Sequence, residues 1–436
     1  MSAKRIRAAL LRPPKRPLEG GVDMPGSKSV TNRALLVAAL APGTSTLTGA
    51  LISDDTQHMM TALRAMGVII EQPRETTMVV TASGILKEPQ APLFLGNAGT
   101  AVRFLTAAAT LVDGKTTVTG DDHMQKRPIG PLIDVLQTMG VAAHAETGCP
   151  PIDIEGVGGF RSGNFEVDGS LSSQYVSALM MIAAMGEEES HLTIGGGKIG
   201  AQGYLRITAA VMEAFGGSVT FEGSNRITVA PGGYTASDYR IEPDASAATY
   251  IWGAEILTGG RLDIGCEPSQ LNQPDAAAYD VIRTFPNMPA EIDGSQMQDA
   301  VPTLAVLAMY NNTPVRFVGI ANLRVKECDR IVAVDQGISR INPGASTIIM
   351  DDLLVTGQPE LASAYRSCQI DTFDDHRIAM SFALAGLMTS GIEILNPDCV
   401  SKTFPNYWDM LAQLGVEMEM IPIESDSPNQ VDTQND

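Results

Sequence analysis

The feature that most constrains the fold is a pattern that recurs along the chain. It consists of a β-prone segment, a short polar stretch, a helix and a glycine. Before Gly67, Gly140 and Gly415, apolar residues stand eight, four and one positions ahead of the glycine, and before Gly216 they stand four and one positions ahead. This spacing places them on one face of a helix, and a glycine just past the last turn is a typical C-terminal signal. The pattern therefore predicts repeated strand–helix units.

Six such units can be traced. Clear copies begin near residues 43, 115, 190 and 391, and weaker copies begin near Gly260 and Thr313, where Asn287 and Asn342 stand in place of the glycine. The units are mostly about 70 residues apart, longer than the roughly 20–50 residues of solenoid repeats. β-branched segments at 44–47 and 116–118 argue against purely helical repeats. We therefore expect an α/β protein whose large modules gather into globular lobes.

The length of 436 residues favours two domains. The lobe boundary is expected near residues 236–240, after the third unit and a hairpin around 232–233. Residues 424–436 are polar and carry net negative charge, so we expect a disordered tail there.

Composition excludes several classes of function. A formal charge of −20 makes nucleic acid and anionic membranes poor partners. The longest apolar runs fall short of the roughly 20 residues that span a bilayer. The five cysteines form no CxxC pair, and the five histidines lack metal-ligand spacing. These features favour a reducing cytoplasm and argue against a disulfide framework or a metal requirement.

Three small-residue segments lie beside a hydroxyl or a cation, at residues 24–29 (MPGSKS), 93–103 (LFLGNAGTAVR) and 126–128 (KRP). Backbone N–H groups can approach an anion closely where side chains are small, and lysine or arginine then neutralises it. An acidic protein with such segments must concentrate positive potential in a cleft. The sequence therefore predicts a site that holds more than one anionic group.

These segments belong to a longer series of motifs, which occur in one order: PGSKSVTNR (25–33), LGNAGTAVR (95–103), GDDHMQKRP (120–128), SSQ (172–174), NLRVKECDR (322–330), DDHRIAM (374–380) and SKTFP (401–405). The series resembles the 5-enolpyruvylshikimate-3-phosphate synthase family from about residue 25 to residue 415. Each motif alone is weak, but seven in register are very specific.

The resemblance implies an α/β fold of six βαβαββ units in two lobes that close over the substrates. The N-terminal segment would cross back to complete the second lobe, so that residues 24–240 form one lobe and residues 1–23 with 241–423 form the other. It implies transfer of the enolpyruvyl group of phosphoenolpyruvate to the 5-hydroxyl of shikimate 3-phosphate, with release of phosphate, on the cytoplasmic route to chorismate and aromatic amino acids. We expect no cofactor and a monomer.

The resemblance also implies the roles of individual residues. The catalytic groups would be Asp299, Glu327, Lys28 and His376. Phosphoenolpyruvate would be held by Lys28, Asn97, Gly99, Thr100, Arg127, Gln174, Arg330, Arg377 and Lys402. Shikimate 3-phosphate would be held by Lys28, Ser29, Arg33, Ser172, Ser173, Gln174, Tyr204, Asp299, Asn322 and Lys326.

The chemistry needs a base for the alcohol proton and an acid for the methylene carbon, exchanging roles in the second half of the reaction. By resemblance Asp299 is the base and Glu327 the acid, with Lys28 as the alternative acid. Glu242 and Asp244 suit either structural support or the site, and Asp374 and Asp375 suit either a helix N-cap or the site. Arg103 is expected to pack under the 96–100 loop.

Two departures from the family pattern stand out. Ala201 replaces a serine that meets the shikimate phosphate in many members, and Phe104 replaces a proline behind the loop. The resemblance also implies competitive inhibition by glyphosate, with sensitivity that follows the small residue at Gly99.

Two other functions compete with this one. A sister transferase acting on UDP-N-acetylglucosamine shares the fold, but it generally has asparagine after the early lysine and a reactive cysteine on a mobile loop. Here Ser29 follows Lys28, residues 120–128 contain no cysteine, and Cys328 stands at a packing position. A non-catalytic anion-binding relative would be expected to lose its acid–base groups first, and these are present.

Overall fold

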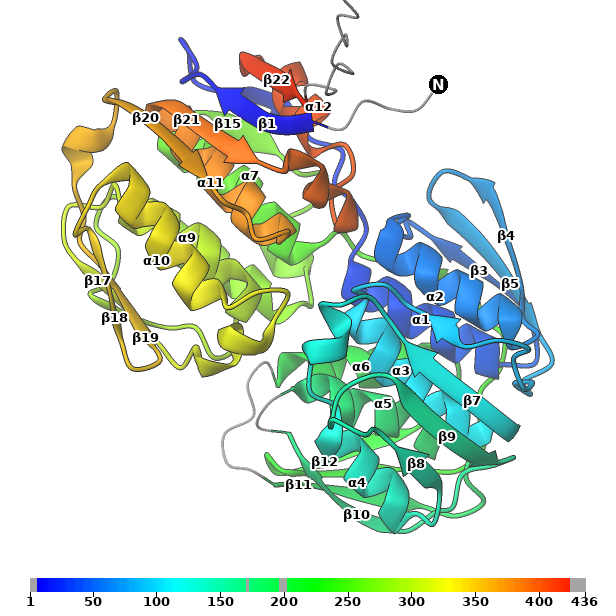
Figure 1. The fold of residues 1–436 in the computed structure, drawn as a ribbon. Helices are drawn as coiled ribbons and strands as arrows, with labels where there is room; N and C mark the ends of the chain where they lie inside the picture. The colour runs from blue at the N-terminus through cyan, green and yellow to red at the C-terminus, as the bar shows by residue number, and fades with distance from the viewer. Residues whose placement is uncertain (1–5, 170–171, 196–201, 424–436) are drawn as a thin grey trace, which may run out of the picture.

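The computed structural model describes residues 6–169, 172–195 and 202–423. Figure 1 shows two lobes, with α1–α6 in one and α7, α9, α10 and α11 in the other. Ala201 and the expected tail at 424–436 lie outside the described residues.

In the described residues, the first lobe holds three four-stranded sheets. Their strand orders are β14 (Tyr239–Arg240)-β3 (Gly43–Thr48)-β5 (Thr77–Ala82)-β4 (Ile69–Arg74); β6 (Leu93–Phe94)-β7 (Asp113–Thr119)-β9 (Ile152–Val157)-β8 (Ala142–His144); and β10 (Asn164–Asp168)-β11 (Ser190–Gly195)-β13 (Arg226–Val229)-β12 (Val219–Glu222). Its helices are α1 (Lys28–Leu40), α2 (Asp54–Ala65), α3 (Gly99–Ala108), α4 (Gly130–Thr138), α5 (Ser173–Ala183) and α6 (Gly203–Ala214).

Within residues 6–23 and 241–423, the second lobe holds two four-stranded sheets and a strand pair. Their orders are β20 (Tyr365–Ile370)-β21 (Ser390–Leu395)-β1 (Ile6–Leu11)-β22 (Met418–Pro422); β16 (Glu291–Asp293)-β17 (Val315–Val318)-β19 (Asp352–Val355)-β18 (Ser346–Ile349); and β15 (Arg261–Asp263)-β2 (Glu19–Gly21). Its helices are α7 (Ala245–Thr258), α8 (Ala278–Ile282), α9 (Val301–Ala308), α10 (Arg330–Ile341), α11 (His376–Met388) and α12 (Tyr407–Gln413).

The four-stranded sheets share one pattern of pairing. In the sheet of β6–β9, for example, β6 pairs with β7 in parallel, while β9 pairs antiparallel with both β7 and β8. A parallel pair needs a crossover, which α3 supplies, and α4 then leads to the closing hairpin. The unit is therefore βαβαββ, and the predicted α/β fold of repeated units in two lobes is confirmed.

Glycine ends the four helices of the clear copies as predicted. Gly67, Gly140, Gly216 and Gly415 have φ of +91°, +80°, +86° and +89°, a region that side chains disfavour. The weaker copies differ. Asn342 caps α10 in an extended conformation with φ of −147°, so it does not take over the role of the glycine.

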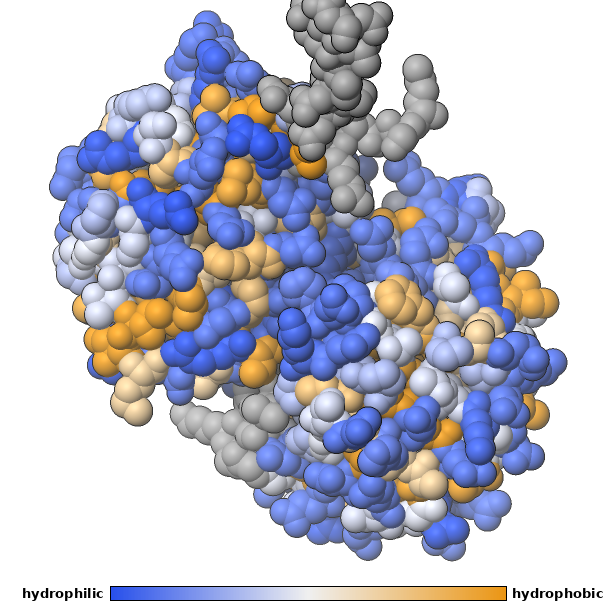
Figure 2. Space-filling model, viewed as in Figure 1, coloured by the Kyte–Doolittle hydropathy of each residue, from blue (hydrophilic) through white to orange (hydrophobic). Residues whose placement is uncertain are grey.

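Each lobe buries its own hydrophobic cluster. One cluster runs from Val30 to Ile241, and the other combines Ala9–Val22 with Ala245–Val416. The central helices are buried on nearly all sides, as in α1, where every residue except Ser29 is buried. Figure 2 shows polar residues spread over both lobes on the face in view, with apolar residues scattered among them. Among the described residues, no helix is long and apolar enough to cross a membrane.

Two crossing segments join the lobes. Gly26 forms an antiparallel bridge with Pro243, and the Ser27 N–H donates to the Glu242 carbonyl at 2.9 Å. A Cβ at position 26 would lie 1.9 Å from the Gly49 carbonyl oxygen, so the crossing requires glycine. Strand β1 pairs antiparallel with both β21 and β22 of the second lobe. The crossing places the start of α1 at the cleft between the lobes.

Candidate active site

A cavity at the junction of the lobes is lined by polar and charged residues from both. They are Lys28, Ser29, Gly99, Thr100, Arg127 and Gln174 from the first lobe, and Asp299, Lys326, Glu327, Arg330 and Arg377 from the second. The sequence motifs contain all of these residues except Asp299, which the family resemblance implied. The fold therefore brings together side chains that stand up to about 350 residues apart in the chain.

The start of α1 presents Lys28 to the cavity. Ser27 caps the helix by accepting from the Val30 N–H, and the Asp244 carboxylate accepts from the Lys28 N–H at 3.3 Å. The Lys28 ammonium lies 3.2 Å from the carboxylate of Asp55, which is buried at the start of α2. Asp244 also caps α7, so its observed contacts are those of a support for the crossing segments.

The loop before α3 forms the adjoining wall. Arg127 Nη1 donates to Asn97 Oδ1 at 3.1 Å, and Gln174 Nε2 donates to Thr100 Oγ1 at 3.2 Å. A Cβ at Gly99 would lie 2.8 Å from both terminal nitrogens of Arg127, so the arginine packs directly on the glycine. This close packing sets where the guanidinium can lie.

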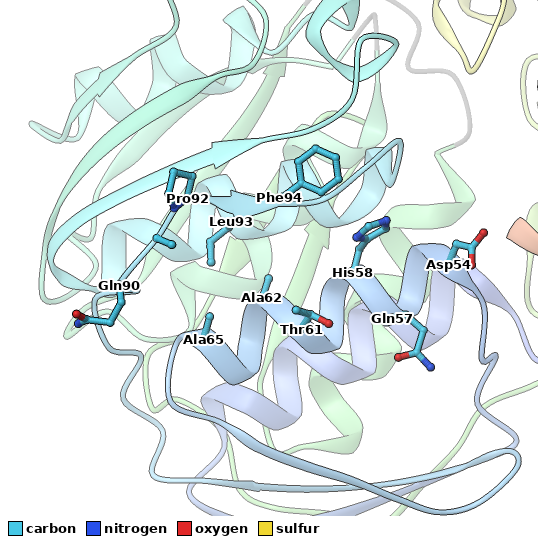
Figure 3. A pocket seen from close by; sticks show the side chains of 11 residues that line it. Asp54, Gln57, His58, Thr61, Ala62, Ala65, Gln90, Pro92, Leu93 and Phe94 are labelled. Atoms are coloured by element: carbon cyan, nitrogen blue, oxygen red, sulfur yellow. The ribbon is translucent and has the colours of Figure 1, made fainter.

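Other residues support the loop from behind. Buried Arg103 donates to the Gly99 and Pro128 carbonyls, which confirms the expected packing role. On the outer side, His58 of α2 lies edge-on to Phe94, with ring centroids 5.8 Å apart. Figure 3 shows these two side chains at one end of a groove between α2 and residues 90–94.

The second lobe contributes a dense network of ion pairs. Arg330 opens α10 and is almost fully buried. Its guanidinium lies 2.8 Å from Asp299, 2.7 Å from Glu327 and 2.7 Å from Asp375. Asp375 also caps α11 by accepting from the Arg377 N–H, which confirms the N-cap interpretation for this residue. Arg377 in turn lies 2.7 Å from Asp299.

Several contacts cross from one lobe to the other. Lys402 Nζ donates to the Asn97 carbonyl at 2.9 Å and lies 3.4 Å from Glu327. Ser401 Oγ donates to the Asp54 carboxylate at 3.3 Å. The two lobes therefore touch at the edge of the cavity.

The electrostatics follow from this crowding of charge. Burial favours the neutral form of Asp299, but Arg377, Lys326 and Arg330 outweigh it and lower its pKa. Burial likewise opposes ionisation of Glu327, yet Lys402, Arg330 and Arg127 bring its pKa well below the usual value. Burial lowers the pKa of Lys326. The carboxyl groups of Asp299 and Glu327 are thus ionised at neutral pH before substrate binds.

His376 is buried beside these groups. Burial, then Lys28 and Arg377, bring its pKa well below the usual value, so the ring is neutral. Neither ring nitrogen has a hydrogen-bond partner among the residues that the structure describes.

Arg33, Ser172, Ser173 and Asn322 were also predicted for the site, but they are not among the residues that line the cavity. Arg33 is buried and donates to Thr208, Ser177 and the Ser29 carbonyl, between the rings of Phe104 and Tyr204. Ser172 caps α5, and Ser173 opens it. Asn322 lies on the 3-10 helix η6 (Ala321–Val325), close in sequence to Lys326.

Sequence motifs missed three acidic or amide residues that contact the site: Asp55, Gln273 and Asp275. Gln273 accepts from Ser27 Oγ and donates to Glu242, which links the two crossing segments. Glu242 is thereby shown to support the crossing. No local pattern signals these residues, because their partners lie on other elements. Cys328 packs against the second hydrophobic cluster, as expected for a packing residue.

Fold and site together define a two-lobed α/β protein with a cavity that is lined by cations from both lobes. The family model described as EPSP synthase (3-phosphoshikimate 1-carboxyvinyltransferase) matches residues 13–411. The chain belongs to this family.

Relatives and solved structures agree with this assignment. A 3-phosphoshikimate 1-carboxyvinyltransferase of Rhizobium leguminosarum bv. trifolii is 61% identical over 93% of this chain and 96% of its own. One from Pseudomonas syringae pv. syringae is 58% identical over 93% of this chain and 97% of its own. The structure of an EPSP synthase from Acinetobacter baumannii is similar with a TM-score of 0.77 and 25% identity, and the match covers 95% of this chain and 100% of that one.

Proposed function

We propose that this chain transfers the carboxyvinyl group of phosphoenolpyruvate to the 5-hydroxyl of shikimate 3-phosphate and releases phosphate. The observation that carries the proposal is the cavity between the lobes, where Lys28, Arg127, Lys326, Arg330 and Arg377 surround two carboxylates. Both substrates are polyanions, and a fixed set of lysines and arginines is what recognises phosphate and carboxylate groups. Family membership supports the same reaction.

We assign phosphoenolpyruvate to the side of the cavity formed by the 97–100 loop. Arg127, Arg330, Arg377 and Lys402 would bind its phosphate and carboxylate. Shikimate 3-phosphate would lie against the starts of α1, α5 and α6, near Ser29, Ser172, Ser173, Tyr204 and Lys326. Arg33 acts on this side through its bond to the Ser29 carbonyl.

The reaction then proceeds in two halves. In the first half, Asp299 accepts the proton of the 5-hydroxyl while the hydroxyl oxygen bonds to C2 of phosphoenolpyruvate. Glu327 donates a proton to the methylene carbon, which becomes a methyl group. In the second, the tetrahedral intermediate expels phosphate while Glu327 recovers a proton from the methyl group, which restores the vinyl group. The proton that Asp299 took from the hydroxyl can then pass to the departing phosphate, so that both carboxyl groups return to their starting states.

Glu327 must be protonated to act as the acid, although the surrounding cations depress its pKa. Bound phosphoenolpyruvate would neutralise Lys402, Arg330 and Arg127, which removes the cause of the depression. Substrate binding would therefore raise the pKa of Glu327 toward the value that acid catalysis requires. Lys28 is the alternative donor.

The decisive experiment is a phosphate-release assay with phosphoenolpyruvate and either shikimate 3-phosphate or UDP-N-acetylglucosamine. We expect turnover when the acceptor is shikimate 3-phosphate and none when it is UDP-N-acetylglucosamine. Turnover with the nucleotide sugar instead would establish the rival transferase, and turnover with neither would favour a non-catalytic relative. We further propose that the enzyme acts as a monomer in the cytoplasm. Light scattering of the purified chain tests the first statement, and cell fractionation tests the second.

A further inference from the structure

Asp275 is a buried carboxyl group beside the site that no sequence motif indicated. It lies on the short 3-10 helix η4 (Pro274–Ala277) and has 0% exposure. Its Oδ2 accepts from the Tyr204 hydroxyl at 2.7 Å, and its Oδ1 accepts from the Asp299 backbone N–H at 3.2 Å. Both oxygens are therefore bound to residues assigned to the reaction.

Asp275 and its partner Tyr204 belong to different lobes. Tyr204 packs against the first hydrophobic cluster, whereas Ala276, the neighbour of Asp275, packs against the second. The start of α6 also meets η4 closely, because a Cβ at Gly203 would lie 2.9 Å from Pro274 Cβ. The Tyr204–Asp275 bond is therefore a contact between lobes, and parting the lobes must break it.

Each end of this contact is held in place by its own lobe. The Tyr204 ring lies 5.6 Å from the guanidinium carbon of buried Arg33, which donates to the Ser29 carbonyl at 2.9 Å. On the other side, Arg330 and Arg377 hold the carboxylate of Asp299, while Asp275 holds its backbone N–H. A shift of Asp275 would thus move the proposed base relative to the first lobe.

We propose that Asp275 is a positioning residue that couples closure of the lobes to the alignment of Asp299. When the lobes close, the Tyr204 hydroxyl reaches Asp275, and the same carboxylate fixes the backbone of Asp299 beside the substrate hydroxyl. The coupling rests on the proposed function, since Asp299 is the base of that reaction. It requires the ionised carboxylate, because only this form offers both oxygens as unencumbered acceptors.

The charge state of Asp275 makes the coupling sensitive to pH. Burial and the charge of Asp299 raise the pKa of Asp275 to about 6, with Asp244 acting in the same direction. Arg377 and the hydrogen bond from Tyr204 oppose the increase. Because the pKa is raised, the neutral acid accumulates as pH falls through about 6, and the coupling should weaken there. A plot of kcat against pH should therefore fall on its acid side near that pH, and we call this fall the acid limb.

The test compares Asp275→Asn, Tyr204→Phe, the double variant and wild type. Tyr234→Phe is the matched control, because it removes the hydroxyl of another buried tyrosine, which donates to the Met181 carbonyl within the first lobe. For each protein we would measure kcat, KM for both substrates and thermal stability, and repeat kcat across pH. Wild-type activity with shikimate 3-phosphate must be established first. Its absence would refute the proposed function, whereas the Asp275 proposal is judged on the variants of an active enzyme.

We expect Asp275→Asn to lower kcat by roughly 10- to 100-fold, the scale of a misplaced catalytic group, with little change in KM for phosphoenolpyruvate. Its acid limb should vanish. Tyr204→Phe should lower kcat less and move the limb to higher pH, because the lost bond no longer stabilises the carboxylate. At saturating shikimate 3-phosphate, kcat of the double variant should be close to that of Asp275→Asn, since both changes remove one coupling. Loss of the proposed substrate contact at Tyr204 should instead raise KM for shikimate 3-phosphate. Tyr234→Phe should leave the limb unchanged.

Several results would overturn the proposal. They are an unchanged kcat and limb in Asp275→Asn, additive losses of kcat at saturating substrate in the double variant, or an equal shift of the limb in Tyr234→Phe. If Asp275→Asn fails to fold, Tyr204→Phe decides alone. A limb that stays at the wild-type pH in this variant refutes the coupling.

Discussion

Gly99→Ala is the sharpest test of how the 97–100 loop positions its arginine. The added Cβ would lie 2.8 Å from both Nη atoms of Arg127 and 2.9 Å from its Cζ. Ordinary contact needs about 3.5 Å, so the guanidinium must move by roughly 0.7 Å. Arg127 also donates to Asn97, so this bond must stretch or break.

The expected cost follows from that displacement. Misplacing a catalytic contact by about 1 Å can cost on the order of 100-fold, so a shift of roughly 0.7 Å should lower kcat/KM for phosphoenolpyruvate about 10-fold, or about 1.4 kcal/mol. Thermal stability should not fall, because alanine favours helix over glycine and Gly99 opens α3. KM for shikimate 3-phosphate should change little.

The assay is steady-state kinetics with each substrate varied, together with inhibition by glyphosate. Because the inhibitor is longer than phosphoenolpyruvate, its inhibition constant should rise more than the substrate KM. Gly130→Ala is the control, since its Cβ would meet nothing within 4 Å. An unchanged kcat/KM for phosphoenolpyruvate in Gly99→Ala, or an equal defect in Gly130→Ala, would refute the reasoning. A wild type that ignores millimolar glyphosate would refute the inhibitor prediction.

Three further predictions concern catalysis, closure and stability. Asp299→Ala and Glu327→Gln should keep the fold and bind shikimate 3-phosphate, but lose at least ~100-fold in turnover; wild-type turnover in both would remove them from the reaction. Small-angle scattering should show a smaller radius of gyration with shikimate 3-phosphate than without it, because the anion screens repulsion between the cations of the two lobes; an equal radius would contradict this. Asp375→Asn should destabilise the fold by about 3 kcal/mol, because it leaves the buried guanidinium of Arg330 short of a charge partner, whereas exposed Asp374→Asn should leave the melting temperature nearly unchanged.

Much of the fold could be predicted from local patterns in the sequence. The spacing of Met59, Leu63 and Met66 before Gly67 predicted the end of α2, and the positive φ of the glycine explains why. The expectation that Asn342 would stand in for the C-terminal glycine was wrong, because the backbone of Asn342 is extended and α10 ends without a left-handed residue at that position. Residue type alone does not reveal how a helix end is capped.

Most of the cavity lining was predictable because it lies in short motifs with a recognisable chemistry, whereas Asp299 lies outside these motifs and was named from the family resemblance. Asp55, Gln273 and Asp275 were not predictable, because their roles arise from partners that folding brings close. Asp275 meets Tyr204 across 71 positions in the chain and Ser27 meets Gln273 across 246. An isolated aspartate or glutamine carries no signal of such a contact.

The placement of β1 has a consequence for synthesis of the chain. This strand is made before the other described strands, yet it pairs with β21 and β22, which begin at Ser390 and Met418. At roughly 5–20 residues per second, β1 must wait on the order of 20–80 s for these partners to leave the ribosome. The first lobe can meanwhile be completed, because its last strand, β14, ends at Arg240. During that interval the nascent chain carries an unpaired strand, which is a natural target for chaperones.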